Sequence, residues 1–243
     1  MYGNPQRSAT NIDGSHSLPQ VKRRLLEIFR DRRDPSYLIA SRTGTLGCKA
    51  NPFLLERMHH VFRKHPQLRR ANLVNCPLKE AHVYGMLLIQ FMADAQKRVV
   101  YVGNQIHHKR IQRWVTPLRF IQVPQHDAFL QVQRVVRELT DLCTKYQDLV
   151  VFVAAGFAAN VIVDEMWKRF KTKHTFMDVG STLDHWFAYR SRALYYRVMQ
   201  PYLQRIKTAK TPTEALRRLA RWVPALRRYF PSRKSAETSR KED

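Results

Sequence analysis

The sequence has little cysteine, and its few cysteines are scattered. Cys48, Cys76 and Cys143 form no Cys-x-x-Cys pair, and their number is odd. A disulfide framework or a zinc knuckle needs cysteines paired at short, regular spacings, so neither is indicated. We therefore expect a reducing compartment and a cytoplasmic location.

Long apolar runs are also missing. The longest, 149–163, is interrupted by Gly156 and Asn160 and is shorter than the roughly 20 residues that a membrane-spanning helix needs. Residues 1–17 are polar and lack the apolar segment of a signal peptide. We expect a disordered leader over 1–17 and a disordered tail over 232–243.

Acidic residues are scarce compared with basic ones. The 243 residues include 43 Lys and Arg against 19 Asp and Glu, which gives a formal net charge of +24. Such a charge attracts nucleotides, nucleic acid or anionic lipid, and it carries no information about the fold. With 44% hydrophobic residues, the chain can still build one sizeable core.

An alternation of apolar runs and helical patterns predicts the fold class. Short apolar runs without polar alternation suit strands that are covered on both faces, and parallel strands need crossover helices. We therefore predict an α/β fold: a Rossmann-like, doubly wound, mostly parallel sheet with flanking helices, over 18–206. The strands predicted from this pattern are 99–102, 120–123, 149–154 and 175–179; the predicted helices are 18–33, 51–65, 78–97, 105–114, 127–146, 157–170 and 186–206.

A basic C-terminal helical extension follows this domain. Thr211-Pro212-Thr213-Glu214 is a capping box with proline at the first helical position, and it predicts the start of a helix within 207–231. Arginines surround an apolar stripe that contains Trp222 and Phe230. The stripe fits either a helix docked on the domain or one lying on an anionic membrane surface, and both interpretations stay open.

Two stretches of the chain carry a family resemblance. Residues 37–44 read as a strand that ends in Arg42-Thr43-Gly44, and residues 149–180 read as strand, Gly156 turn, helix, and a strand that ends in Asp178-Val179-Gly180. This arrangement resembles the glycosyltransferases with the GT-D fold, over roughly residues 20–200. The resemblance implies transfer of a hexosyl group from a nucleotide-diphosphate sugar to a glycan or another hydroxyl acceptor.

The chain departs from that family at one important place. The family's Asp-x-Glu pair, which binds the metal and the sugar-nucleotide diphosphate, is replaced by Thr45 and Gly47. We therefore assign no cofactor and no metal ligand, and dependence on Mn²⁺ or Mg²⁺ stays open. Either cations of the chain neutralise the diphosphate, or the chain is a scaffold that has lost catalysis.

The candidate site residues follow the ends of predicted strands. Glycine lets backbone N–H groups approach a phosphate, hydroxyls donate to it, and a guanidinium can bind two of its oxygens. The alternative for the Arg42 turn is an ordinary strand-to-loop turn, and adjacent histidines such as His107-His108 point apart on a helix and predict no metal site. The candidate donor-binding residues are Arg42, Gly44, Thr45, Gly103, Asn104 and Gly156.

Two carboxylates that flank Gly180-Ser181 are the candidate catalytic residues. Asp178 or Asp184 would accept the proton of the acceptor hydroxyl, or orient that hydroxyl. A turn cap or a loop carboxylate is an equally open interpretation of each. As an alternative to an enzyme, the charge and the interspersed aromatic residues also fit a non-enzymatic nucleic-acid-binding protein, although no recognised nucleic-acid motif occurs.

Overall fold

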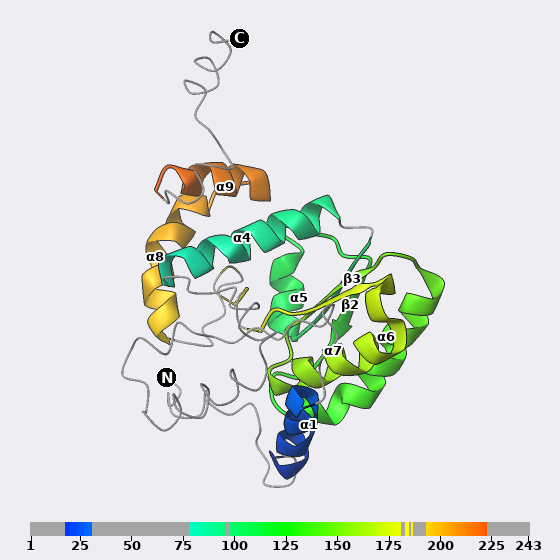
Figure 1. Cartoon of the computed structure of the whole chain (residues 1–243). Coiled ribbons are helices and arrows are strands. Elements are labelled where there is room, and N and C mark those ends of the chain that lie inside the picture. The colour runs from blue at the N-terminus through cyan, green and yellow to red at the C-terminus, as the bar shows by residue number, and fades with distance from the viewer. Residues whose placement is uncertain are drawn as a thin grey trace, which may run out of the picture.

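The computed structural model describes residues 18–30, 78–95, 98–180, 183–184, 186 and 193–222. The strand predicted over 37–44, the helix predicted over 51–65, and both termini lie outside these residues. The described elements, in chain order, are α1 (Leu18–Arg30), α4 (Leu78–Asp94), β1 (Val99–Gly103), α5 (Gln105–Ile111), β2 (Arg119–Gln122), η4 (Ala128–Gln131), α6 (Val132–Lys145), β3 (Val150–Val153), α7 (Phe157–Phe170), η5 (Lys171–Lys173), β4 (Thr175–Asp178), α8 (Ala193–Ile206) and α9 (Pro212–Ala220) (Figure 1).

The described strands form one parallel sheet in the order β2-β1-β3-β4. Helix α5 connects β1 to β2 on one side of β1, whereas α7 connects β3 to β4 in the other direction. The chain therefore reverses its direction of winding between β1 and β3, which is the topological switch point of a doubly wound sheet. This arrangement confirms the predicted α/β, Rossmann-like fold class.

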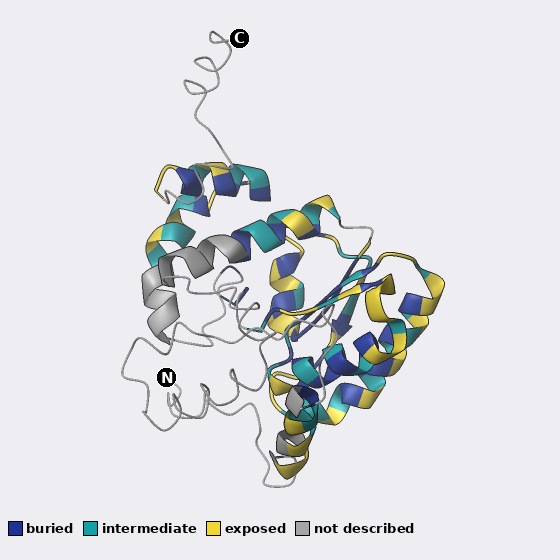
Figure 2. Ribbon diagram, viewed as in Figure 1, coloured by how far each residue is buried: buried dark blue, intermediate teal, exposed yellow. Residues whose placement is uncertain are grey.

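Helices cover both faces of the sheet (Figures 1 and 2). In β1, Val99 and Tyr101 pack into a core with α4, α5, α8 and α9, while Val100 and Val102 pack into a second core with α1, α6 and α7. A strand that is covered by helices on both faces has to be apolar on both sides. This burial on both faces explains why the apolar run of β1 shows no polar alternation in the sequence.

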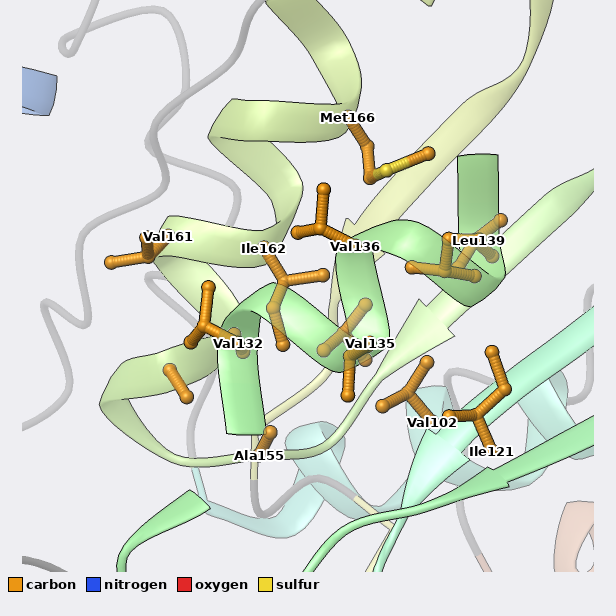
Figure 3. Packing of buried hydrophobic residues seen from close by; sticks show 14 of the residues in the cluster. Val102, Ile121, Val132, Val135, Val136, Leu139, Ala155, Val161, Ile162 and Met166 are labelled. Carbon is orange, nitrogen blue, oxygen red and sulfur yellow. The ribbon is translucent and has the colours of Figure 1, made fainter. Parts of the chain in front are cut away.

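The core between the sheet and helices α6 and α7 shows why these helices form where the pattern predicts. On α6, apolar residues recur every three or four positions and therefore share one face. Val135 and Leu139 on α6 meet Ile162 and Met166 on α7 above the sheet, and all four are fully buried (Figure 3). Helix α7 has the predicted bounds, because Gly156 precedes it and basic residues occupy its last turn.

Two predicted helices differ from the structure. Trp186, from which a helix was expected, lies in a turn, and its side chain enters the core; the described helix α8 spans Ala193–Ile206. The helix expected over 127–146 is divided into the 3₁₀ turn η4 and the helix α6. Asp127 before it has a left-handed backbone, and its side chain makes no capping hydrogen bond. Burial of Trp186 and this backbone turn are tertiary effects that local periodicity does not contain.

The C-terminal helix begins at its capping box. Thr211 accepts a hydrogen bond from the Glu214 N–H at 3.1 Å, and Glu214 Oε2 accepts one from the Lys210 N–H at 2.8 Å. The apolar side chains of α9 are buried in the core that contains α4, and the Thr213 hydroxyl donates to Gln90 Oε1 at 2.8 Å. The described part of this helix is thus docked on the domain.

No helix in the described ranges combines the length and apolar character that crossing a bilayer requires. Beyond the docked face of α9, Trp222 is 61% exposed, with the Arg205 guanidinium 4.2 Å from the centre of its ring. The described segment therefore packs its apolar face on α4, while Trp222 at its end is largely in solvent.

Candidate functional site

Residues from three neighbouring strands meet at the carboxyl edge of the sheet. Gly103 ends β1, Gly156 follows β3, and Asp178 ends β4. The registers Val102↔Val153 and Val153↔Asp178 align these strand ends. In doubly wound α/β proteins, ligands bind outside this edge at the switch point. The structure therefore brings Gly103, Asn104, Gly156 and Asp178 to the place where the fold class binds ligands.

Asp178 is the accessible carboxylate of this edge. Its Oδ1 accepts a hydrogen bond from the Gly180 N–H at 2.8 Å, and its Oδ2 accepts one from Asn160 Nδ2 at 3.1 Å. Solvent reaches the side chain, yet the surrounding protein removes enough water to raise the pKa of Asp178 to about 6, against the opposing effect of the Gly180 hydrogen bond. A carboxyl group with such a pKa exchanges protons near neutral pH.

Gly156 has a backbone conformation that side chains rarely adopt, with φ 57° and ψ −137°. This conformation turns the chain from β3 into α7, so glycine is needed for the turn itself. The Ala158 and Ala159 N–H groups donate to the carbonyls of Ala155 and Gly156 at 3.2 and 3.1 Å. Two amides of the first turn are therefore already paired, which weakens the interpretation of this helix start as a phosphate site.

Gly103 and Asn104 both have structural tasks. The Asn104 side chain caps α5 by accepting a hydrogen bond from the His107 N–H at 3.0 Å. A Cβ atom on Gly103 would lie 2.6 Å from Tyr101 Cε1 and 3.3 Å from His107 Nδ1. These two predicted donor-binding residues therefore shape the turn from β1 to α5, whatever else they contact.

Asp184 lies in a different environment from Asp178. It is 4% exposed, and its Oδ1 lies 3.0 Å from His107 Nε2. On the other side of the same imidazole, Nδ1 lies 3.0 Å from the Tyr101 hydroxyl. An acceptor substrate cannot reach Asp184 in this conformation, so the two candidate catalytic carboxylates are separated into one accessible and one buried group.

Sequence reasoning missed His107 and Tyr101 as members of this cluster. Part of the signal was in the sequence, because Asn104 precedes His107 by the three residues that separate a helix cap from the amide it binds. Tyr101 and Gly103 also share one face of β1, as alternate residues of a strand do. The partner that completes the cluster, Asp184, follows β4 and is remote in the sequence.

The cations on α5 and just after it have different tasks. Lys109 and Arg110 are exposed on α5. Arg113 instead donates to the carbonyls of Lys207 at 2.6 Å and Ala209 at 3.2 Å, beyond the end of α8, and so ties α5 to the C-terminal helices. Arg42, Gly44 and Thr45 lie outside the described residues. Among the residues described, no three His, Cys, Asp or Glu side chains gather as a metal site would require.

The candidate site combines the switch point between β1 and β3, the accessible Asp178 and the buried cluster around His107. Compared with known proteins, the chain matches no family model, no curated protein and no solved structure.

Proposed function

We propose that the chain is a glycosyltransferase that binds a nucleotide-diphosphate sugar at the carboxyl edge of its sheet and transfers the hexosyl group to a hydroxyl acceptor. The observation that supports this proposal is Asp178, an accessible carboxyl with a pKa of about 6 at the end of β4. A general base works best when its pKa lies near the working pH.

In the proposed reaction, Asp178 accepts the proton of the acceptor hydroxyl as that oxygen attacks the anomeric carbon. Asn160 and the Gly180 N–H bind the two carboxylate oxygens and fix the orientation of the base. Negative charge develops on the departing diphosphate, and positioned cations stabilise it. The Arg42 turn, predicted from sequence, and the exposed Lys109 and Arg110 are the groups proposed for this task.

A thermal-shift titration with nucleotide diphosphates and nucleotide sugars, with and without Mn²⁺, tests donor binding. A ligand at about 100 times its Kd stabilises the native state by about 2.7 kcal/mol, which raises Tm by roughly 5–10 °C in a chain of this size. We expect such a shift for one donor and its loss in Arg42→Ala. Arg137→Ala, which changes an exposed arginine on α6, is the matched control and keeps the shift.

A transfer assay with the donor identified in this way tests the base. Asp178→Asn preserves the shape of the side chain but cannot accept the proton, so we expect turnover to fall by at least about 100-fold while the thermal shift persists. Asp141→Asn, an exposed position on α6, controls for the loss of one charge. Absence of a shift with every nucleotide would refute the donor-binding proposal.

The net charge of +24 favours a second candidate function, binding of a polyanion such as nucleic acid without catalysis. This candidate predicts affinity for oligonucleotides that falls steeply with salt and is indifferent to base sequence. Nucleotide-sugar binding without turnover would instead indicate a GT-D-like scaffold that has lost catalysis. An anionic membrane surface is the remaining proposed partner, and sedimentation with anionic vesicles tests it.

A further inference from the structure

Three polar side chains from separate parts of the chain meet inside the protein next to the candidate site. Tyr101, His107 and Asp184, together called the buried triad below, are 0%, 2% and 4% exposed. Two 3.0 Å contacts connect them, from the Tyr101 hydroxyl to His107 Nδ1 and from His107 Nε2 to Asp184 Oδ1. Polar groups are costly to bury without partners. The His107–Asp184 pair lies at ion-pair distance, although its geometry falls short of a hydrogen bond.

The buried triad spans the carboxyl edge of the sheet. Tyr101 belongs to β1, and His107 lies in the first turn of α5, but Asp184 follows β4, which is separated from β1 by β3. At about 4.8 Å per strand interval, the chain after β4 has to travel roughly 10 Å across the end of β3 to reach His107. The contact of Asp184 with His107 therefore joins the chain after β4 to the start of α5.

Apolar residues of the same segment anchor it in the core. Val179, Leu183 and Trp186 are buried in the core that contains α4 and α5. Apolar contacts are non-directional, however, and they do not fix one orientation of a backbone. The polar contact of Asp184 supplies a direction, because His107 is itself fixed by the Asn104 cap and the Tyr101 hydroxyl.

We propose that the buried triad positions the segment after β4 across the carboxyl edge, and thereby sets the place of Asp178 and Gly180 in the candidate site. Asp184 is then a positioning residue and not a catalytic one. This inference rests on the proposed function in treating Asp178 as the base. The geometry itself stands without that assignment, because the Gly180 N–H donates a hydrogen bond to Asp178 where the segment begins.

A catalytic role for the buried triad itself fits the structure poorly. Burial, followed by the Asp184 carboxylate, raises the pKa of the Tyr101 hydroxyl well above its ordinary value, so this hydroxyl keeps its proton at neutral pH. With exposed fractions of 0%, 2% and 4%, the three residues offer solvent or substrate almost no surface. What they can do is hold one another, and the segment attached to Asp184, in place.

Amide hydrogen exchange of the full, ligand-free chain tests the proposal. The Val179 N–H donates to the Val153 carbonyl at 3.0 Å, at the start of the positioned segment; the Thr175 N–H donates to the Leu149 carbonyl at 2.9 Å, at the opposite end of β4. Asp184→Leu keeps the branched skeleton of the side chain, with two methyl groups in place of the two oxygens, and makes no polar contact with His107. We expect Val179 to exchange at least about tenfold faster in this variant, with much less change at Thr175.

Two further variants make the result specific. Asp184→Asn keeps an oxygen towards His107 Nε2, so we expect a smaller acceleration at Val179 than in Asp184→Leu. Tyr101→Phe removes only the hydroxyl and serves if Asp184→Leu does not fold; it too should accelerate Val179 over Thr175. Asp141→Leu, at an exposed site on α6, should change neither amide.

Equal acceleration of Val179 and Thr175 would overturn the proposal, because it would show a general loss of stability. An unchanged Val179 amide in Asp184→Leu would overturn it as well. Neither result involves a nucleotide, so failure here is distinguishable from failure of the proposed function, which the nucleotide panel decides. In the transfer assay, a positioning role predicts that Asp184→Leu lowers kcat and leaves the KM for the donor unchanged.

Discussion

Substitution of Gly103 by alanine separates a packing role of this residue from a ligand-binding role. The new Cβ would lie 2.6 Å from Tyr101 Cε1, a distance that real Cβ atoms do not tolerate, so one of the two groups has to move. Tyr101 is fully buried, its hydroxyl contacts His107, and its ring stacks on Phe120 with centroids 5.5 Å apart. The ring therefore has little room to shift.

The expected magnitude follows from two opposing effects. Overpacking of a core in this way costs about 1–3 kcal/mol. Alanine recovers about 0.5–1 kcal/mol relative to glycine inside a strand, because it loses less backbone entropy on folding, and Gly103 is not among the positive-φ glycines. We therefore expect Gly103→Ala to lower the free energy of unfolding by about 1–2 kcal/mol, equivalent to a Tm lower by roughly 2–8 °C.

Denaturant unfolding of the single and double variants measures this effect. In a Tyr101→Leu background the offending ring carbon is gone, so Gly103→Ala should cost less there, with a coupling energy of at least about 0.5 kcal/mol. Unchanged or increased stability of Gly103→Ala with the native tyrosine would refute the packing argument. If nucleotide binding were lost at the same time, Gly103 would instead be a donor-binding residue.

Three further changes have distinct expected outcomes. His174 accepts a hydrogen bond from the Leu149 N–H at 3.1 Å, and burial lowers the pKa of its imidazole. The neutral imidazole therefore contributes to the free energy of unfolding above pH 6.5, and this contribution is lost as pH falls. We expect His174→Gln to flatten the acid side of a stability–pH curve measured by urea unfolding. The pKa of Asp178 is raised from 3.8 to about 6, so the protonated carboxyl contributes to the free energy of unfolding at low pH, and this contribution is lost as pH rises through about 6. Above that pH, Asp178→Asn should therefore be more stable than the native chain. Thr211→Ala removes the α9 cap and should cost about 1 kcal/mol by thermal unfolding, whereas the exposed control Thr116→Ala should change stability by less than about 0.5 kcal/mol.

The predictable part of the fold is the part that local chemistry determines. Helix α7 has the bounds expected from its sequence, since Gly156 forces a turn before it and basic residues complement its last turn. Strand β1 was predictable because both of its faces are apolar and both are buried. Trp186 was placed in a helix by the aromatic and basic pattern around it, but its insertion into the core outweighs that pattern.

The site was predictable in location and not in its division of roles. Parallel strands bring their carboxyl ends to one edge, so residues that follow each strand had to gather there. Asp178 and Asp184 are only six residues apart in the sequence, yet one is accessible and the other is buried against His107. Nothing local distinguishes them, because burial of Asp184 depends on residues of β1 and α5.

Two of the predicted donor-binding residues have structural roles that the geometry shows. Gly103 accommodates the Tyr101 ring, and Asn104 caps α5, so substitutions at either residue should first reduce stability, with affinity falling only as a consequence. Asp178, exposed at the end of β4, has no such duty in a core. If the proposed function is right, Asp178→Asn should lower turnover without lowering stability, and Arg42→Ala should remove donor binding. This contrast tests the site more sharply than loss of activity at any one residue.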